Sequence, residues 1–397
     1  MTASQPVSEP GRQRFRVLIA GGGTGGHVIP ALAIARELRD AHGAEVRFVG
    51  TARGLETRLV PEAGFPLELI QVGQLKNVSL LTRVRTMANL PRGVMQCIGL
   101  VRRFHPDVVV GVGGYASGPA MMAAILLKVP TLAFEPNAVP GLANRLVGKW
   151  VSAAAVNFEE TRKYFRGARV TGIPVRKEFF EIAPLPESES VRASLRYIPP
   201  NHQRGSSPHL LVFGGSQGAR VFNDVMPRIA RRLLEYVPGL TMLHQTGPKQ
   251  AKSTEEAYRA SGADPSRWAV AAYLDDMPKR FADADLILCR SGASTVAELA
   301  AAGRPAVMVP FPGAADDHQM KNAEAFARVQ AAELRVQDAD DLMEGFLFSD
   351  LAGLLLNPER LVEMGRLARG LAHPDAVREI GQMAAELGGP PPLIARV

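Results

Sequence analysis

Residues of this chain that could take part in chemistry follow glycine-rich segments of the sequence. Five of the six residues from Gly21 to Gly26 are glycine, and His27 follows directly. Glycines let backbone approach a ligand closely, and a helix N-terminus offers unpaired N–H groups to an anion. A neutral imidazole at that end can take a proton from a hydroxyl. The stretch predicts an anion-binding loop with His27 as candidate general base, or else a histidine that only hydrogen-bonds the loop.

The same glycines fit a dinucleotide fingerprint, G-x-G-x-x-G, at Gly21, Gly23 and Gly26. That fold also needs an acidic residue about 20 residues further on, at the end of the second strand. The predicted strand ends in Phe48–Arg53, which contains no acid. NAD is therefore disfavoured, whereas NADP bound through Arg53, or a purely structural tight turn, stays open.

Two further strand-to-helix junctions carry polar residues. Gly214–Arg220 is a second glycine loop, and Arg290–Glu298 follows the predicted strand Leu286–Cys289. Thr295 and Glu298 have the S/T-x-x-E spacing of a capping box, which is the structural interpretation. The functional interpretation places an anion at this helix N-terminus and a ribose hydroxyl on Glu298. The residues alone do not separate the two.

An acidic loop, Asp316–His318, precedes a predicted helix over Gln319–Val329. These side chains could form part of a metal site, but no second ligand cluster accompanies them. Asp side chains near the positive end of a helix are the favoured interpretation. The two cysteines, Cys97 and Cys289, lie far apart without metal-ligand spacing, which is typical of a reducing compartment. No bound metal or cofactor is expected.

The elements around these motifs alternate between strand and helix. Buried-type strands are predicted at Val17–Ala20, Glu45–Val49, Asp107–Gly111, Thr131–Phe134, His209–Phe213, Thr241–Gln245, Ala269–Ala272, Leu286–Cys289 and Ala306–Val309. Strands that alternate with helices indicate βαβ units and parallel sheets. A chain of 397 residues is long for one core. The pattern predicts an α/β protein of two Rossmann-like domains in tandem.

The domain bounds follow from where this rhythm stops. A proline- and serine-rich stretch over 184–207 separates the halves, and helices end the chain. We expect a flexible tail over 1–14, an N-terminal domain over 15–174 and a C-terminal domain over 175–372. A last helix at about 373–390 is expected to pack back on the N-terminal domain.

The net charge of +7 is concentrated in one segment. Gln71–Pro106 holds six Lys or Arg and no Asp or Glu, with apolar residues between the cations. Either it is a helix with a solvated basic face, or it meets an anionic membrane. Phe104 is its only aromatic residue, which disfavours nucleic acid. No apolar run reaches the roughly 20 residues of a membrane span, and no secretory signal is predicted.

Eight motifs in order resemble the MurG family of peptidoglycan N-acetylglucosaminyltransferases, in glycosyltransferase family 28. They are Gly22–His27, Gly111–Tyr115, Glu135–Asn137, Gly172–Arg176, Gly214–Ala219, Asp275–Met277, Ser291–Glu298 and Asp316–Gln319. The resemblance covers about Phe15 to Ala325 and implies a GT-B fold, with two Rossmann-like doubly wound domains facing across a cleft. Pro136 stands where Gln is frequent in the family.

The resemblance also implies an activity. It is an inverting transfer of N-acetylglucosamine from UDP-N-acetylglucosamine to the 4-hydroxyl of the muramoyl residue of lipid I, which gives lipid II for the cell wall. The family needs no catalytic metal, and UDP-N-acetylglucosamine is a substrate rather than a cofactor. The alternatives are a glycolipid glycosyltransferase, a UDP-N-acetylglucosamine epimerase, an NADP oxidoreductase and a basic nucleic-acid- or membrane-binding module without activity.

The resemblance also implies site residues, each by its position in a matched motif. For the nucleotide sugar, the resemblance implies ribose on Glu298, diphosphate near Ser216 and the turn Ala293, Ser294 and Thr295, uracil by Leu274, and sugar hydroxyls on Gln319. The remaining matched positions are Thr24, Gly25, Gly26, Asn137 and Arg176, with His27 as the candidate base.

The resemblance places the protein at the cytoplasmic face of the bacterial inner membrane as a peripheral protein. Lys76, Arg83, Arg85 and Arg92 would meet the anionic surface. Cell-wall synthesis and division proteins are further expected partners, and nucleic acid is not.

Overall fold

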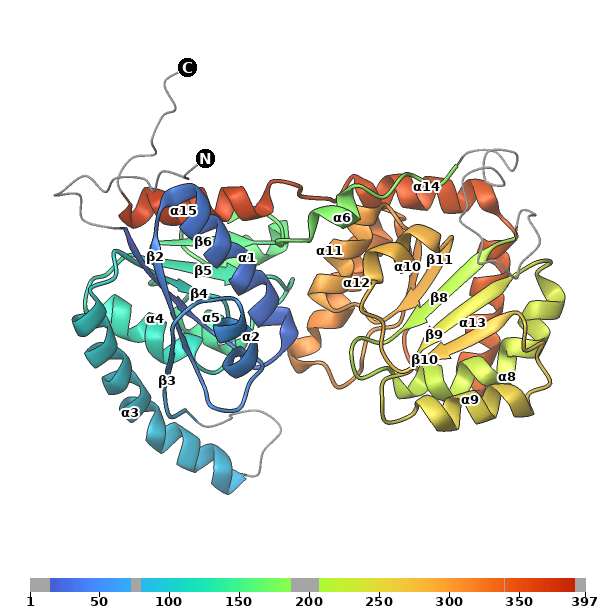
Figure 1. The fold of residues 1–397 in the computed structure, drawn as a ribbon, viewed down its shortest axis with the longest axis horizontal. Helices are drawn as coiled ribbons and strands as arrows, with labels where there is room; N and C mark the ends of the chain where they lie inside the picture. Colours follow the sequence, from blue (N-terminus) through green and yellow to red (C-terminus); the bar gives the residue numbers. More distant parts are fainter. Residues whose placement is uncertain (1–14, 73–79, 187–206, 339, 390–397) are drawn as a thin grey trace, which may run out of the picture. The chain divides into compact units, whose positions relative to one another are not determined.

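The structure is a computed structural model that describes residues 15–72, 80–186, 207–338 and 340–389; the side chains of 80–90, 315, 340 and 341 are not described. The chain divides into two compact units. Unit 1 comprises the described parts of residues 1–135, 141–171 and 377–397, and unit 2 comprises those of 136–140 and 172–376. Each unit is an α/β sandwich around one parallel sheet (Figure 1).

The sheet of unit 1 has seven strands in the order β3-β2-β1-β4-β5-β6-β7. Their bounds are β1 Arg16–Ala20, β2 Glu45–Gly50, β3 Leu67–Leu69, β4 Val108–Gly111, β5 Thr131–Glu135, β6 Ala153–Val156 and β7 Ala168–Val170. The strand pairs of this sheet are parallel, and β1 pairs with both β2 and β4. The order reverses beside β1, so the loop after β1 lies at the switch point where ligands of such sheets bind.

Helices cover both faces of this sheet. They are α1 Gly25–His42, α2 Glu56–Glu62, α3 Leu80–Phe104, α4 Ser117–Leu126, α5 Leu142–Val147 and α15 Ala376–Gly388, with a 3₁₀ turn η1 at Glu159–Tyr164. Apolar residues of α3 and α4 share one core with the strands. Figure 1 shows α1 and α15 on the opposite side of the sheet. A Cβ on Gly381 of α15 would lie 2.8 Å from Cγ of Glu37, so α15 packs directly on α1.

The sheet of unit 2 has six strands in the order β10-β9-β8-β11-β12-β13, again parallel. Their bounds are β8 His209–Phe213, β9 Thr241–Gln245, β10 Trp268–Ala271, β11 Leu286–Cys289, β12 Ala306–Met308 and β13 Ala332–Leu334. The switch point lies between β8 and β11, where the second glycine loop and the Arg290–Glu298 segment begin. The expected pair of doubly wound Rossmann-like sheets is confirmed.

The helices of unit 2 again lie on both faces. They are α6 Lys177–Phe180, α8 Arg220–Tyr236, α9 Ala251–Ala260, α10 Met277–Asp283, α11 Ala293–Ala302, η2 Ala315–Asp317, α12 His318–Arg328, α13 Asp340–Leu355 and α14 Pro358–Arg369. The apolar faces of α8 and α13 meet the strands in one large core. Figure 1 shows α10, α11 and α12 on the other side of the sheet. None of the helices within the described residues combines the length and apolar composition of a membrane span.

Candidate functional site

The first glycine loop joins β1 to α1 in unit 1. Thr24 is the N-cap of α1 and is exposed, so Gly25 and Gly26 begin the helix and His27 lies in its first turn. The side chain of Thr24 makes no capping hydrogen bond. The first N–H groups of a helix have no partner within it. The four positions therefore stand together at an uncapped helix N-terminus, as the sequence predicts.

A second loop, Gly111–Tyr115, packs on the first one. Gly113 adopts a φ of +89°, and a Cβ on it would lie 2.8 Å from Cε1 and 2.9 Å from Nδ1 of His27. Gly114 lies against the carbonyl of Gly22 in the same way. The imidazole thus rests on bare backbone, so its position depends on glycine at 113.

A buried carboxylate that the sequence analysis missed supports the first loop from beneath. Glu56, the first residue of α2, accepts hydrogen bonds from the N–H of Gly23 at 2.7 Å and from the N–H and hydroxyl of Thr51, both at 3.0 Å. Its side chain is 1% exposed. The acid that a dinucleotide fold would carry at the end of β2 is absent, but Glu56, at the start of α2, is bound to the loop itself.

The turn after β5 holds Asn137 among the residues of unit 2. The amide of Asn322 on α12 is fully buried; it accepts from the N–H of Ala138 at 3.0 Å and donates to the carbonyl of Ser291 at 3.1 Å. It also donates to the side-chain oxygen of Asn137 at 3.3 Å. Asn322 therefore ties Asn137 to the start of the Ser291–Glu298 motif, a link of 185 positions that spacing could not reveal.

The N-terminus of α11 differs from the sequence prediction. Its N-cap is Gly292, and no side chain caps it. Thr295 is already the third residue of the helix, so the capping-box interpretation of Thr295 and Glu298 is wrong: the backbone turns into the helix three residues earlier than that motif requires. Ala293, Ser294 and Thr295 are partly exposed, and the first N–H groups of a helix have no partner within it.

Glu298 is a partly buried carboxylate on the same helix. It makes no hydrogen bond with the residues that the structure describes. Burial raises the pKa of its carboxyl from 4.5 to about 7, and the charge of Arg176 opposes that rise. Arg176 is exposed at the N-cap of α6, with its guanidinium 5.2 Å from the centre of the Phe179 ring. A free carboxylate beside a cation suits a ligand that brings hydroxyl donors.

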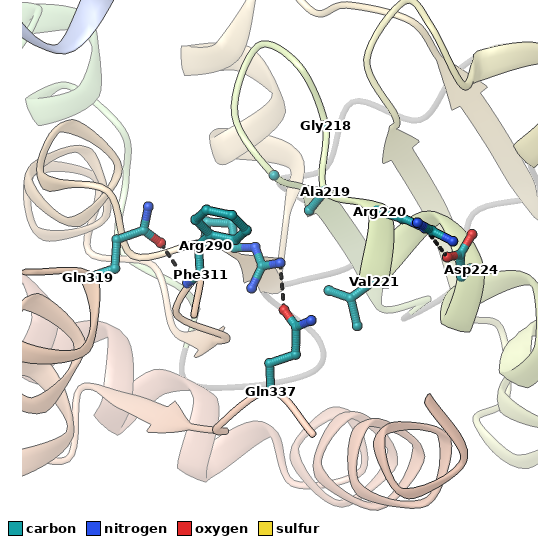
Figure 2. Close-up of a pocket in the computed structure, with 10 residues that line it drawn as sticks. Gly218, Ala219, Arg220, Val221, Asp224, Arg290, Phe311, Gln319 and Gln337 are labelled. Atoms are coloured by element: carbon teal, nitrogen blue, oxygen red, sulfur yellow. Dashed lines mark hydrogen bonds and ion pairs between the residues drawn. The ribbon is translucent and has the colours of Figure 1, made fainter. Parts of the chain in front are cut away.

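A cavity of about 560 Å³ opens beside the second glycine loop in unit 2 (Figure 2). Of the predicted site residues, Gln319 lines it: its side-chain oxygen accepts from the N–H of Phe311 at 3.0 Å, and its carbonyl from the hydroxyl of Ser291 at 2.8 Å. The other lining residues are Gly214, Gly218, Ala219, Arg220, Val221, Asp224, Arg290, Phe311 and Gln337. Ser216 is exposed in the loop between β8 and α8, and Leu274, after β10, is buried.

Arg290 is a further residue to which the sequence analysis gave no role of its own. Its guanidinium donates to the carbonyls of Val309 and Pro310 at 3.0 and 2.9 Å, and to Gln337 at 2.8 Å. Burial lowers its pKa to about 10. By fixing the loop after β12 it also fixes Phe311, the partner of Gln319. Its position directly after a buried strand is the signal that could have found it.

The acidic loop Asp316–His318 lies in η2 and at the start of α12. Asp316 and Asp317 both have positive φ, 55° and 56°, an uncommon conformation for residues with a side chain. Within the described ranges, no group of three His, Cys, Asp or Glu side chains could hold a metal ion.

Comparison with known proteins places the chain. The glycosyltransferase family 28 N-terminal domain matches residues 17–156, and the C-terminal domain of the same family matches 209–380. A relative from Anaeromyxobacter sp. strain Fw109-5 is 42% identical over 376 residues, 94% of this chain and 93% of its own length. Its name is UDP-N-acetylglucosamine–N-acetylmuramyl-(pentapeptide) pyrophosphoryl-undecaprenol N-acetylglucosamine transferase. The chain belongs to the MurG family.

Further MurG-family members agree with this placement. A relative of the same name from Cupriavidus metallidurans is 43% identical over 373 residues, 94% of this chain and 98% of its own. The crystal structure of Acinetobacter baumannii MurG superposes with a TM-score of 0.75 at 30% identity, covering 94% of this chain and 99% of that one. The fold is therefore GT-B, and the chain is a family 28 glycosyltransferase, as the eight motifs indicate.

Proposed function

We propose that this MurG-family chain transfers N-acetylglucosamine from UDP-N-acetylglucosamine to the 4-hydroxyl of the muramoyl residue of lipid I, with inversion, giving lipid II. The observation that carries the proposal is that relatives named for this activity align with 94% of the chain. The uncapped helix N-termini of α1 and α11 support it, since both substrates contain a diphosphate.

The donor side lies in unit 2. Glu298 accepts hydrogen bonds from the ribose hydroxyls, because its carboxylate has no partner of its own among the described residues. The diphosphate faces Ser216 and the first turn of α11, at Ala293, Ser294 and Thr295, with Arg176 as the cation. Leu274 lies by the uracil, and Gln319 holds sugar hydroxyls.

The residues proposed for the acceptor are Thr24, Gly25, Gly26 and His27, which belong to unit 1, and Asn137, which belongs to unit 2. The N–H groups of Thr24, Gly25 and Gly26 bind the lipid diphosphate. His27 takes the proton of the attacking hydroxyl while the new bond forms at the anomeric carbon. The bond from that carbon to the diphosphate oxygen breaks, and UDP leaves with its charge met by the α11 N-terminus and Arg176. This reaction calls on no resident metal or cofactor.

We further propose that the protein meets the cytoplasmic face of the inner membrane, where its lipid-anchored acceptor would lie. Lys76 lies outside the described residues, and the side chains of Arg83 and Arg85, on α3, are not described. Arg92 on the same helix is exposed. Exposed apolar residues nearby support contact with lipid: Met95 of α3 is 65% exposed, and Leu126 of α4 is 60% exposed.

The test is UDP release by the purified protein with and without lipid I. We expect release only with lipid I; release without a lipid acceptor would indicate an epimerase or a hydrolase. Glu298→Ala should raise the KM for the donor and leave the acceptor KM unchanged, with exposed Glu256→Ala of α9 as control. An unchanged donor KM in Glu298→Ala removes the ribose role. Saturable binding of NADPH in place of UDP-N-acetylglucosamine refutes the whole proposal.

A further inference from the structure

Glu56 lies in a site built around its carboxylate. Oε2 accepts from the N–H of Gly23, and Oε1 from both the N–H and the hydroxyl of Thr51. No cation of the described chain pairs with it, and it is 1% exposed. A buried carboxylate is costly unless hydrogen bonds satisfy it, so the three donors are what keep Glu56 in place.

Three glycines make room for this side chain. A Cβ on Gly50 would lie 2.7 Å from Cγ of Glu56, and Cβ atoms on Gly22 and Gly54 would strike its carboxylate. Gly22 belongs to the first glycine loop, whereas Gly50 and Gly54 flank the end of β2. Gly22 of the first glycine loop is thus required by the protein's own carboxylate, whatever ligand the loop binds.

The N–H groups from Gly23 to Gly26 fall into two sets, one bonded to Glu56 and one without an acceptor among the described residues. The N–H of Gly23 turns inward to Glu56, whereas those of Thr24, Gly25 and Gly26 have no acceptor among the described residues. Both oxygens of Glu56 already accept hydrogen bonds, which removes it as the ribose-binding acid of a dinucleotide fold.

We propose that Glu56 is a positioning residue for the acceptor: by holding Gly23 N–H inward, it sets the N–H groups of Thr24–Gly26 to bind the acceptor's diphosphate. This inference rests on the proposed function. It assigns to Glu56 a role in acceptor affinity that a residue needed only for folding would not have, because its effect falls on one substrate of two.

Glu56→Gln tests the role with little change of shape. An amide keeps one acceptor oxygen, and its NH₂ group must then face the N–H of either Gly23 or Thr51. Because one hydrogen bond of this kind is lost, we expect the acceptor KM to rise about tenfold, which corresponds to about 1.4 kcal/mol, while the donor KM stays unchanged. Thr51→Val, which removes only the hydroxyl donor, should act in the same direction and more weakly.

The control is Glu62→Gln, an exposed carboxylate at the other end of α2 that pairs with Arg58 at 3.4 Å. It should leave both KM values unchanged. Thermal unfolding of each variant shows whether it is folded at the assay temperature. Amide hydrogen exchange of the peptide containing Gly23 gives a readout without turnover: exchange should accelerate in Glu56→Gln and not in Glu62→Gln.

The outcomes separate this inference from the proposed function. An acceptor KM that is unchanged in folded Glu56→Gln, or that rises in parallel with the donor KM, overturns the inference and leaves the proposed function intact. Absence of lipid I turnover by the unmodified protein overturns both. If Glu56→Gln does not fold, Thr51→Val decides: an unchanged acceptor KM together with unchanged exchange at Gly23 refutes the role.

Discussion

Replacing Glu298 by Gln should make the protein more stable in alkaline solution. The carboxyl is partly buried on α11 without a hydrogen bond from the described residues, so its neutral form is favoured in the folded protein. A group whose pKa is raised by folding contributes stability that is complete below its unfolded pKa, here 4.5, and lost as pH rises through its folded pKa, about 7.

The magnitude follows from the two pKa values of Glu298. Each pH unit between them corresponds to about 1.4 kcal/mol, which gives about 3 kcal/mol for the separation between 4.5 and about 7. Most of this lies between pH 5 and pH 8.5, where we expect about 2–3 kcal/mol. The Gln side chain in Glu298→Gln carries no charge, so this variant should not lose that part of its free energy of unfolding as the pH rises.

Urea unfolding of both proteins at pH 5 and pH 8.5 measures the effect. For each protein, the free energy of unfolding at pH 8.5 is subtracted from that at pH 5. The two results are then compared, because all other groups titrate alike in both proteins. The exposed Glu256→Gln serves as control for removing a surface carboxylate. Parallel loss of stability in Glu298→Gln and the unmodified protein would refute the reasoning, since it means that Glu298 is not strained by burial.

Three more predictions concern unit 1. His27→Ala should lower kcat by about 100- to 10,000-fold with normal thermal unfolding, and wild-type turnover would remove His27 from the mechanism. Gly113→Ala places a methyl group 2.8 Å from the imidazole, so kcat should fall about tenfold in the lipid I assay without change in donor KM; a normal kcat contradicts this support. Reversing charge at Arg83 and Arg85 should weaken binding to anionic but not neutral vesicles in sedimentation by about tenfold or more, whereas equal binding leaves only a solvated helix face.

The sequence predicts best where local signals are strong. The predicted strands His209–Phe213 and Thr241–Gln245 match β8 and β9 residue for residue, because β-branched and apolar residues end at glycine or polar turns. Strands β3, β6, β7 and β13 were not predicted. β6 is Ala-Ala-Ala-Val, a composition with no β preference, and it is a strand because it pairs with β5 and β7.

The candidate site shows the same contrast between residues with a local sequence signal and residues placed by distant partners. Thr24–His27 were predicted because glycines and a helix start are adjacent in sequence. Glu56 and Asn322 were not, since their partners lie 33 and 185 positions away. The capping-box interpretation, one of the two left open, failed for a related reason: the motif was present, but the strand before it ends at Cys289 and the helix begins at Ala293.

The position of α15 has a consequence for how the protein is made. Its side chains at Ile380, Met383 and Ala384 are buried in unit 1, and Gly388 lies against the backbone of Asp107. About 200 residues of unit 2 leave the ribosome between β7 and this helix. At about 5–20 residues per second, unit 1 stays without its last helix for about 10–40 s. An apolar surface near α1 is therefore open to chaperones during each round of synthesis.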